Sequence, residues 1–176
     1  MKFTAFLALA LLAVAIMRVE ALSYGNVVIT QATKSVDLNT QLVYEDSFIT
    51  FKNSGGSSLS ELYFALEDKY LARVALITVE DPEDGSLYKH EEIPDPEAAA
   101  KHNATIFKIH LKNSLAPSKD IRIKVSVTYY QRMEALPKEI TVLEEQLMVF
   151  EDSSILFSPY KILLQNSEYK LAGPVK

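Results

Sequence analysis

The chain has 176 residues, of which 48% are hydrophobic and 23% charged, and its formal net charge at pH 7 is −5. This length and composition suit one domain with a hydrophobic core of its own. The negative charge argues against nucleic acid as a partner, which would require a basic face. The absence of cysteine excludes thiol catalysis, cysteine-ligated zinc and redox exchange, whereas a secreted domain of this length can fold without disulfides.

The amino terminus has the layout of a cleaved signal peptide. A basic start at Lys2 precedes an apolar run of 13 residues, Ala5–Met17, and small residues follow at Val19–Ala21, where a signal peptidase would cut. The run is shorter than the roughly 17–25 residues of a membrane-spanning helix. We therefore predict a signal peptide at residues 1–21 and a mature domain at residues 22–176 that contains no membrane span. Removing the signal peptide takes away two basic residues and one acidic residue, so the net charge becomes −6.

The first half of the mature chain predicts short strands joined by polar turns. The expected elements are strands over Val27–Leu38, Leu42–Lys52 and Leu62–Leu66, a turn or short helical piece around Glu67–Ala72, and a further strand through Val79. The segment Asn53–Ser58 contains two glycines, but no Lys-Ser or Lys-Thr pair follows at the spacing of a phosphate-binding loop. A plain turn is therefore expected there.

An acidic turn divides the chain. Glu80–Gly85 lacks the ordered ligand series of an EF-hand loop, so we expect a solvated turn and no calcium site. Ser86–Glu92 is then expected as a short edge strand. Asp95–Lys101 has an N-cap aspartate, a proline at the first helical position and a run of alanines, which predict a helix of one or two turns. Thr105–Leu111 has the pattern of another strand.

The clearest strand pattern is Ile121–Tyr130. Five apolar or aromatic residues alternate in it with five others, and neither glycine nor proline interrupts the run. Successive side chains on a strand point to opposite faces, so one face is expected in the core and the other in water. Gln146–Phe150 and Ile155–Phe157 supply further short strands. Together these patterns predict an all-β fold, an antiparallel β-sandwich-like domain with a short helical insertion.

The sequence contains no recognisable catalytic or metal-binding motif. The three histidines, His90, His102 and His110, form no His-Glu-x-x-His pair, and no Gly-x-Ser-x-Gly elbow supplies a nucleophile. The carboxylate pairs Glu91-Glu92 and Glu144-Glu145 are adjacent in sequence. Adjacent side chains on a strand point to opposite faces, which makes a poor acid/base couple. We therefore predict no catalytic residue, no metal site and no cofactor.

One tripeptide marks a modification site. Asn103-Ala104-Thr105 matches the N-glycosylation acceptor pattern, and the predicted signal peptide would bring it into the secretory pathway. We therefore predict a glycan on Asn103. This site would make the chain a substrate of glycosylation and says nothing about its taking part in the reaction.

Two motifs near the carboxyl end carry a resemblance to a known family. Gln146–Glu151, which contains Val-Phe-Glu, is followed after a short gap by Phe157–Tyr160, which contains Ser-Pro-Tyr. This order and spacing are similar to those of the amino-terminal luminal region of the ribophorin I family. The similarity in strand pattern extends from Val36–Leu38 through Phe64–Glu67 to the carboxyl end. Family members continue into a second luminal domain, a membrane-spanning helix and a cytosolic portion, so the resemblance covers only their first quarter to third.

The resemblance implies a role in protein N-glycosylation. It implies a non-catalytic subunit of the oligosaccharyltransferase complex, which transfers oligosaccharide from dolichyl diphosphate to the asparagine of Asn-x-Ser/Thr in nascent proteins. The implied location is the luminal side of the endoplasmic reticulum, and the implied partners are other subunits of the complex and nascent secretory polypeptides. In this family the chemistry belongs to another, multispanning subunit.

The residues alone leave two other functions open. A secreted β-sandwich that binds a ligand or a protein would present a continuous exposed aromatic patch, for which Tyr63, Tyr88 and Tyr130 are the candidates. A secreted hydrolase would require Glu144–Glu145 or Glu151 to converge with a histidine in one pocket.

Overall fold

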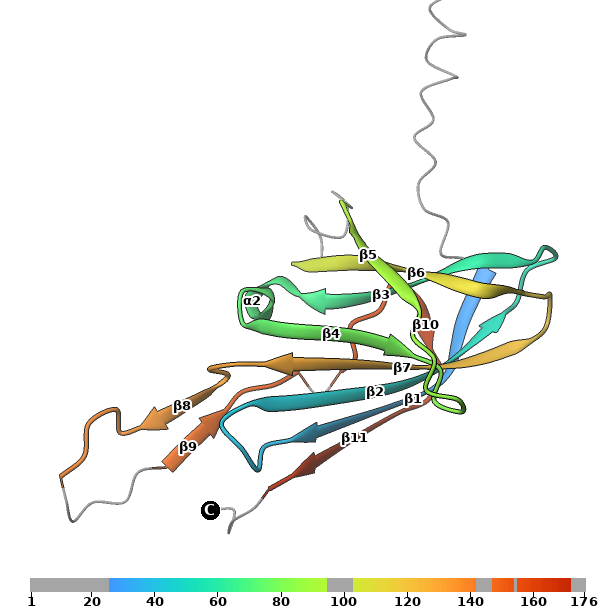
Figure 1. Ribbon diagram of the computed structural model, residues 1–176. Coiled ribbons are helices and arrows are strands. Elements are labelled where there is room, and N and C mark those ends of the chain that lie inside the picture. Colours follow the sequence, from blue (N-terminus) through green and yellow to red (C-terminus); the bar gives the residue numbers. More distant parts are fainter. Residues whose placement is uncertain (1–25, 95–102, 142–146, 154, 172–176) are drawn as a thin grey trace, which may run out of the picture.

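The computed structural model describes residues 26–94, 103–141, 147–153 and 155–171, which form two packed β-sheets and a projecting hairpin (Figure 1). The predicted signal peptide and the predicted helix at residues 95–101 lie outside these ranges. The elements in chain order are β1 (Val27–Asp37), β2 (Val43–Asn53), β3 (Leu59–Glu67), α2 (Asp68–Leu71), β4 (Val74–Glu80), β5 (Lys89–Ile93), β6 (Ala104–Leu115), β7 (Asp120–Tyr129), β8 (Met133–Leu136), β9 (Leu147–Phe150), β10 (Lys161–Ile162) and β11 (Gln165–Lys170). The predicted all-β fold with a short helical insertion is therefore confirmed.

The larger sheet is built around β2, which pairs antiparallel with β1 on one side and with β7 on the other. The register places Ile49 of β2 opposite Ala32 of β1 and Ile123 of β7. Apolar side chains therefore stack across three strands on one face of the sheet. Along β7, Ile123, Val125 and Val127 are all buried, which confirms the inward face predicted from the alternation of this strand.

The carboxyl-terminal strands add two parallel pairings to the otherwise antiparallel sheets of the described residues. β10 and β11 both pair with β1 in parallel. Residues 155–157, which were expected as a strand, are irregular instead. β11 is exposed along nearly all of its length, so it has no hydrophobic alternation by which the sequence could have predicted it. β11 is held in the sheet by backbone hydrogen bonds, and the hydrophobic pattern of a sequence does not report such bonds.

The smaller sheet, in the order β3-β6-β5, packs against the larger one and encloses the main core (Figure 1). Leu62 of β3 and Ile109 of β6 are fully buried. The rings of Phe64 and Phe107 stack with their centroids 5.0 Å apart. β6 runs to Leu115, beyond the predicted end of this strand, because Leu115 pairs with Leu59 of β3 on the far side of an irregularity in the register.

Tyr160 connects the two sheets. Its ring meets the ring of Phe51 in the larger sheet edge-on, with centroids 5.8 Å apart. Its hydroxyl accepts a hydrogen bond from the backbone N–H of Tyr63 in the smaller sheet at 3.0 Å. The turn at Ser158–Tyr160 therefore brings into the core a side chain that touches both layers of the sandwich.

A buried asparagine organises the turn after β2. Asn53 is fully buried, and its side-chain amide donates to the carbonyl oxygens of Ser57 and Leu115 at 2.8 and 2.9 Å. Its Oδ1 accepts from the backbone N–H of Gly55 at 2.9 Å. A Cβ atom on Gly55 would lie 3.0 Å from the Cβ of Asn26, so the close packing of this turn explains the glycine.

We expect Val125→Asp to unfold the domain and Lys124→Gln to leave it folded. Val125 is 3% exposed in the core, and an unpaired buried carboxylate costs several kcal/mol out of a typical stability of roughly 5–15 kcal/mol. Lys124 faces outward and pairs with Glu80 at 2.9 Å, a partly exposed contact worth about 1 kcal/mol or less. Thermal melts of the two variants measure the difference. Equal losses of stability would show that the faces of β7 are assigned wrongly.

Candidate functional site

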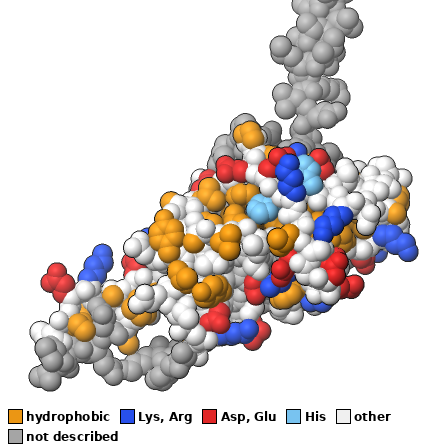
Figure 2. Space-filling view, in the orientation of Figure 1, with side chains coloured by type: hydrophobic (Ala, Val, Ile, Leu, Met, Phe, Trp, Pro, Cys, Tyr) orange, Lys and Arg blue, Asp and Glu red, His pale blue; other side chains and the backbone are white. Residues whose placement is uncertain are grey.

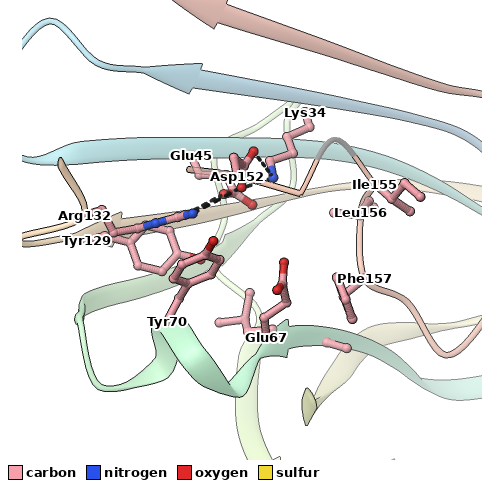
Figure 3. A pocket seen from close by; sticks show the side chains of 12 residues that line it. Lys34, Glu45, Glu67, Tyr70, Tyr129, Arg132, Asp152, Ile155, Leu156 and Phe157 are labelled. Atoms are coloured by element: carbon pink, nitrogen blue, oxygen red, sulfur yellow. Dashed lines mark hydrogen bonds and ion pairs between the residues drawn. The ribbon is translucent and has the colours of Figure 1, made fainter. Parts of the chain in front are cut away.

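Four side chains of opposite charge are buried together (Figure 3). Lys34 belongs to β1 and Glu45 to the neighbouring β2, whereas Arg132 follows β7 and Asp152 follows β9. Their side chains are 6%, 8%, 1% and 5% exposed, respectively. Charged residues are almost never this deeply buried unless they are paired. We call these four residues the ionic cluster.

Asp152 is the centre of the ionic cluster. Its Oδ2 lies 2.7 Å from Lys34 Nζ, and its Oδ1 lies 3.2 Å from Arg132 Nη2. The hydroxyl of Tyr169 on β11 donates to the same carboxylate at 2.9 Å. Glu45 is held more loosely, because its Oε2 lies 3.5 Å from Lys34 Nζ and 3.8 Å from Arg132 Nη1. Short charge-assisted hydrogen bonds are the strong ones, so Asp152 contributes more to the network than Glu45.

Arg132 is held by aromatic rings in addition to its ion pairs. Its guanidinium carbon lies 3.6 Å from the ring centroid of Tyr70, 4.8 Å from that of Tyr129 and 4.9 Å from that of Phe150. Its Nη2 also donates to the backbone carbonyl of Glu151 at 3.0 Å. The planar and weakly hydrated guanidinium suits such a stack better than an ammonium would. Among the described residues, its Nε has no hydrogen-bond partner.

Burial raises the pKa of acids in and next to the ionic cluster. For Glu45, desolvation is the largest effect and raises the pKa of the carboxyl, while the charge of Lys34 acts in the opposite direction. Burial and the Asp152 carboxylate raise the pKa of Tyr169 to about 12. Burial also raises the pKa of Tyr129 far above its usual value. Both tyrosines therefore stay protonated at neutral pH, and Tyr169 remains a hydrogen-bond donor.

A small cavity of about 20 Å³ adjoins the ionic cluster. A water molecule requires about 10–15 Å³ and a small-molecule pocket about 300–1,000 Å³, so this cavity has room for a water and not for a substrate. Besides the cluster, Tyr70 and Tyr129, its walls are formed by Ala65, Leu66, Glu67, Ile155, Leu156 and Phe157. Within the described ranges, no group of three or more His, Asp or Glu side chains is placed to hold a metal ion. The geometry is that of an ion network which joins separate chain segments.

The two histidines in the described part of the chain, His90 and His110, contact different groups. His110 lies on β6, where its Nε2 is 3.1 Å from the Glu91 carboxylate of β5. Lys108 contacts the same carboxylate at 2.8 Å, and this hydrogen bond is the main reason that the pKa of Glu91 is lowered. His90 packs edge-on against the ring of Phe64 instead. His102 lies outside the described residues.

The carboxylates proposed for a hydrolase are not brought together with a histidine in the part of the chain that the structure describes. Glu144 and Glu145 lie outside that part. Glu151 is exposed, and only its backbone carbonyl takes part in the site, accepting from Arg132 at 3.0 Å and from the Tyr70 hydroxyl at 3.1 Å.

The three tyrosines proposed for an aromatic patch have different surroundings. Tyr63 is partly buried on β3, and its hydroxyl donates to the Glu61 carboxylate at 3.1 Å. Tyr88 is only 8% exposed, and its hydroxyl donates to Asp81. Tyr130 is 41% exposed, and its hydroxyl donates to the carbonyl of Ala72 at 2.6 Å. On the face shown in Figure 2, hydrophobic side chains gather instead over α2 and β4, where Leu76 is 57% exposed. Because Tyr88 is buried, these three tyrosines do not form the continuous exposed patch that would favour the alternative of a ligand-binding sandwich.

Asn103 lies on the surface immediately before β6. Its side chain is exposed, and its backbone has a φ of 48°, a left-handed conformation that asparagine adopts more readily than most residues. Its carbonyl accepts from the backbone N–H of Asp68 at 2.8 Å. The hydroxyl of Thr105, the third residue of the acceptor pattern, donates to the Asp68 carboxylate at 2.7 Å.

Sequence reasoning missed all four members of the ionic cluster. Two of them had a detectable signal, because Lys34 and Glu45 occupy inward positions of alternating strands, between buried residues two positions away on either side. A charged residue at such a position requires a buried partner of opposite charge. Arg132 and Asp152 had no such signal, since both lie in irregular segments next to short strands.

These features define a class of protein: an all-β sandwich domain whose buried polar site joins chain segments. The chain belongs to the ribophorin I family, whose family model matches residues 27–175. The resemblance noted in the sequence is thereby confirmed, and the family match extends over both sheets and the projecting hairpin.

Relatives of the chain carry the name dolichyl-diphosphooligosaccharide–protein glycosyltransferase subunit 1. The chain is 27% identical over 150 residues to subunit 1B of Oryza sativa subsp. japonica, covering 81% of this chain and 31% of the relative. It is 25% identical over 148 residues to subunit 1B of Arabidopsis thaliana, covering 81% and 32%. It is 24% identical over 134 residues to subunit 1 of Caenorhabditis elegans, covering 76% and 22%. The chain thus spans about a third or less of the length of these relatives.

Solved structures give a weaker similarity. An M1 zinc metallopeptidase from Deinococcus radiodurans aligns with a TM-score of 0.40 and 10% identity, covering 62% of this chain and 22% of the metallopeptidase. A TM-score this low supports no inference about fold or function. Over the described residues, no helix is long and apolar enough to cross a membrane.

The raised pKa of Glu45 predicts the direction of a pH effect on stability. A carboxyl whose pKa is higher in the folded chain than in the unfolded chain binds more protons when folded, so folding gains from this group as the pH falls toward the ordinary value of 4.5. Glu45→Gln removes the titration. We expect the stability of the variant, measured relative to wild type, to be higher at about pH 7 than at about pH 5, whatever the constant cost of losing a partner of Lys34. Urea unfolding of both chains at the two pH values measures this difference, and a relative stability that rises on acidification would contradict the prediction.

Proposed function

We propose that the chain is a luminal part of subunit 1 of a dolichyl-diphosphooligosaccharide–protein glycosyltransferase and takes part in protein N-glycosylation. The family match over residues 27–175 carries the proposal. The relatives with 24–27% identity, which carry the name of this subunit, support it. The predicted signal peptide at residues 1–21 agrees with a location on the luminal side of the endoplasmic reticulum.

We further propose that the chain contributes without performing the transfer. Displacing a lipid diphosphate requires positioned carboxylates and a divalent metal to hold the phosphates. In the described part of the chain, the buried carboxylates of Glu45 and Asp152 are already offset by Lys34 and Arg132. A net charge of −6 after signal cleavage would also repel a diphosphate. The contribution would come through contacts with other subunits and with nascent secretory polypeptides.

We expect the tagged full chain, expressed in cells with its signal peptide, to co-purify from a mild detergent extract with oligosaccharide transfer activity. The purified chain alone should form no glycopeptide from a lipid-linked oligosaccharide and an acceptor peptide in the presence of Mn²⁺. The matched control is Val125→Asp, which should lose the association because it loses the fold. An unrelated β-domain carrying residues 1–21 controls for simple passage through the same compartment.

Two results would contradict these proposals separately. A folded and luminal chain that recovers no transfer activity above the unrelated domain would contradict membership of the complex. Glycopeptide formed by the purified chain above a protein-free reaction, and abolished by a single carboxylate substitution such as Asp152→Asn, would contradict the non-catalytic role.

We also propose that Asn103 carries an N-linked glycan. Its side chain is exposed at the start of β6, where a bulky glycan can extend into solvent without displacing the core. We expect endoglycosidase treatment of the secreted or luminal chain to increase its gel mobility, and Asn103→Gln to abolish this shift.

Two variants at Thr105 separate modification from local strain. Glutamine adopts the left-handed conformation of Asn103 less readily than asparagine, so Asn103→Gln can also perturb the turn. Thr105→Ala destroys the acceptor pattern and leaves Asn103 in place, whereas Thr105→Ser preserves the pattern. The shift should be absent in the first and present in the second. An unchanged wild-type band after enzyme treatment would contradict the proposed glycan.

A further inference from the structure

The hairpin of β8 and β9, which we call the arm, stands apart from both sheets. Among the described strands, β8 and β9 pair only with each other. Figure 1 shows them projecting beyond the end of the sandwich. Leu136, Leu147 and Met148 are 57%, 46% and 56% exposed. A two-stranded hairpin is marginally stable by itself in water, so the position of the arm depends on what holds its ends.

Both ends of the arm enter the ionic cluster. Arg132 directly precedes β8, and Asp152 follows β9 after one intervening residue. The two side chains bind each other at 3.2 Å and so close the base of the hairpin. Asp152 also binds Lys34 in β1 at 2.7 Å. The arm is therefore tied to the larger sheet through its two flanking charges.

Other contacts of the arm are concentrated at the same base. Lys34 Nζ donates to the carbonyl of Ser153 at 3.2 Å, and the Tyr70 hydroxyl donates to the carbonyl of Glu151 at 3.1 Å. Met133 and Phe150, the first residue of β8 and the last of β9, pack partly buried against the main core. Beyond this pair, the described strands of the arm present mostly exposed side chains.

We propose that the ionic cluster is a latch: closed, it holds the arm in place, and open, it releases the arm while the two sheets stay folded. The sheets have their own connections, since β1 and β2 are paired along most of their length. The arm has no strand pairing to either sheet among the described residues. Segments with few such connections open at a lower free energy than the whole domain.

The balance of charges explains why loss of one partner would open the latch. The ionizable groups lining this site are Lys34 from β1, Glu45 from β2, Glu67 from β3, Tyr70 from α2, Tyr129 from β7, Arg132 and Asp152, with Tyr169 from β11 bound to Asp152. Two cations and two carboxylates cancel within the ionic cluster. Neutralising Asp152 leaves two buried cations with one loosely held carboxylate, and an uncompensated buried charge is strongly unfavourable. Opening exposes Arg132 to water and relieves this cost.

Hydrogen exchange of the full chain, followed by mass spectrometry, tests the latch. In Asp152→Asn we expect the amides of β8 and β9 to exchange about tenfold faster than in wild type, or more, because this variant loses charge-assisted hydrogen bonds at the base of the arm. Amides of β2 and β7, which lie in the middle of the larger sheet, should exchange at the wild-type rate. They provide the internal reference for global stability.

A milder variant and a matched control complete the experiment. Tyr169→Phe removes one hydrogen bond from Asp152 without changing its charge, so it should accelerate exchange of the same segments to a smaller degree. If Asp152→Asn does not fold, Tyr169→Phe is the variant that tests the latch. Glu91→Gln removes a partly exposed carboxylate that pairs with Lys108 and should leave the arm unchanged. Unaltered exchange of the arm in folded variants, or an equal increase in β2 and β7, would overturn the proposal.

Discussion

A buried carboxylate must be offset by nearby cations, and this constraint connects segments that are far apart in the chain. The side chain of Asp152 is 5% exposed and binds Lys34 from the first strand and Arg132 from the segment after β7. Completing such a network yields little net stability, but leaving one member unpaired costs several kcal/mol. The ionic cluster is therefore better suited to specifying where segments lie than to raising the stability of the domain.

The two motifs that carry the family resemblance have clear structural tasks. In Val149-Phe150-Glu151, the phenylalanine ring lies against the Arg132 guanidinium and the Glu151 carbonyl accepts hydrogen bonds from Arg132 and Tyr70. In Ser158-Pro159-Tyr160, the tyrosine touches Phe51 of one sheet and the Tyr63 backbone of the other. One motif thus supports the base of the arm, and the other joins the layers of the sandwich. The contacts of both motifs help to assemble the domain.

The described surface agrees with a domain that works through contacts. Its buried polar site is filled by its own charges, and the adjoining cavity of about 20 Å³ has room for little more than a water. Exposed apolar side chains occur on the arm and around Leu76 of β4.

The sequence by itself determined the all-β class, the inward face of β7 and the family. Alternation and short motifs are local properties of the sequence, so they can be recognised before the fold is known. It also placed a turn or short helical piece after β3, where the structure has α2. It did not determine the parallel addition of β10 and β11, since β11 is polar and exposed and its pairing uses only the backbone. Nor did it determine the ionic cluster. Lys34 and Glu45 were conspicuous charges at inward positions, but their partners Arg132 and Asp152 come from irregular segments whose location only the folded chain decides.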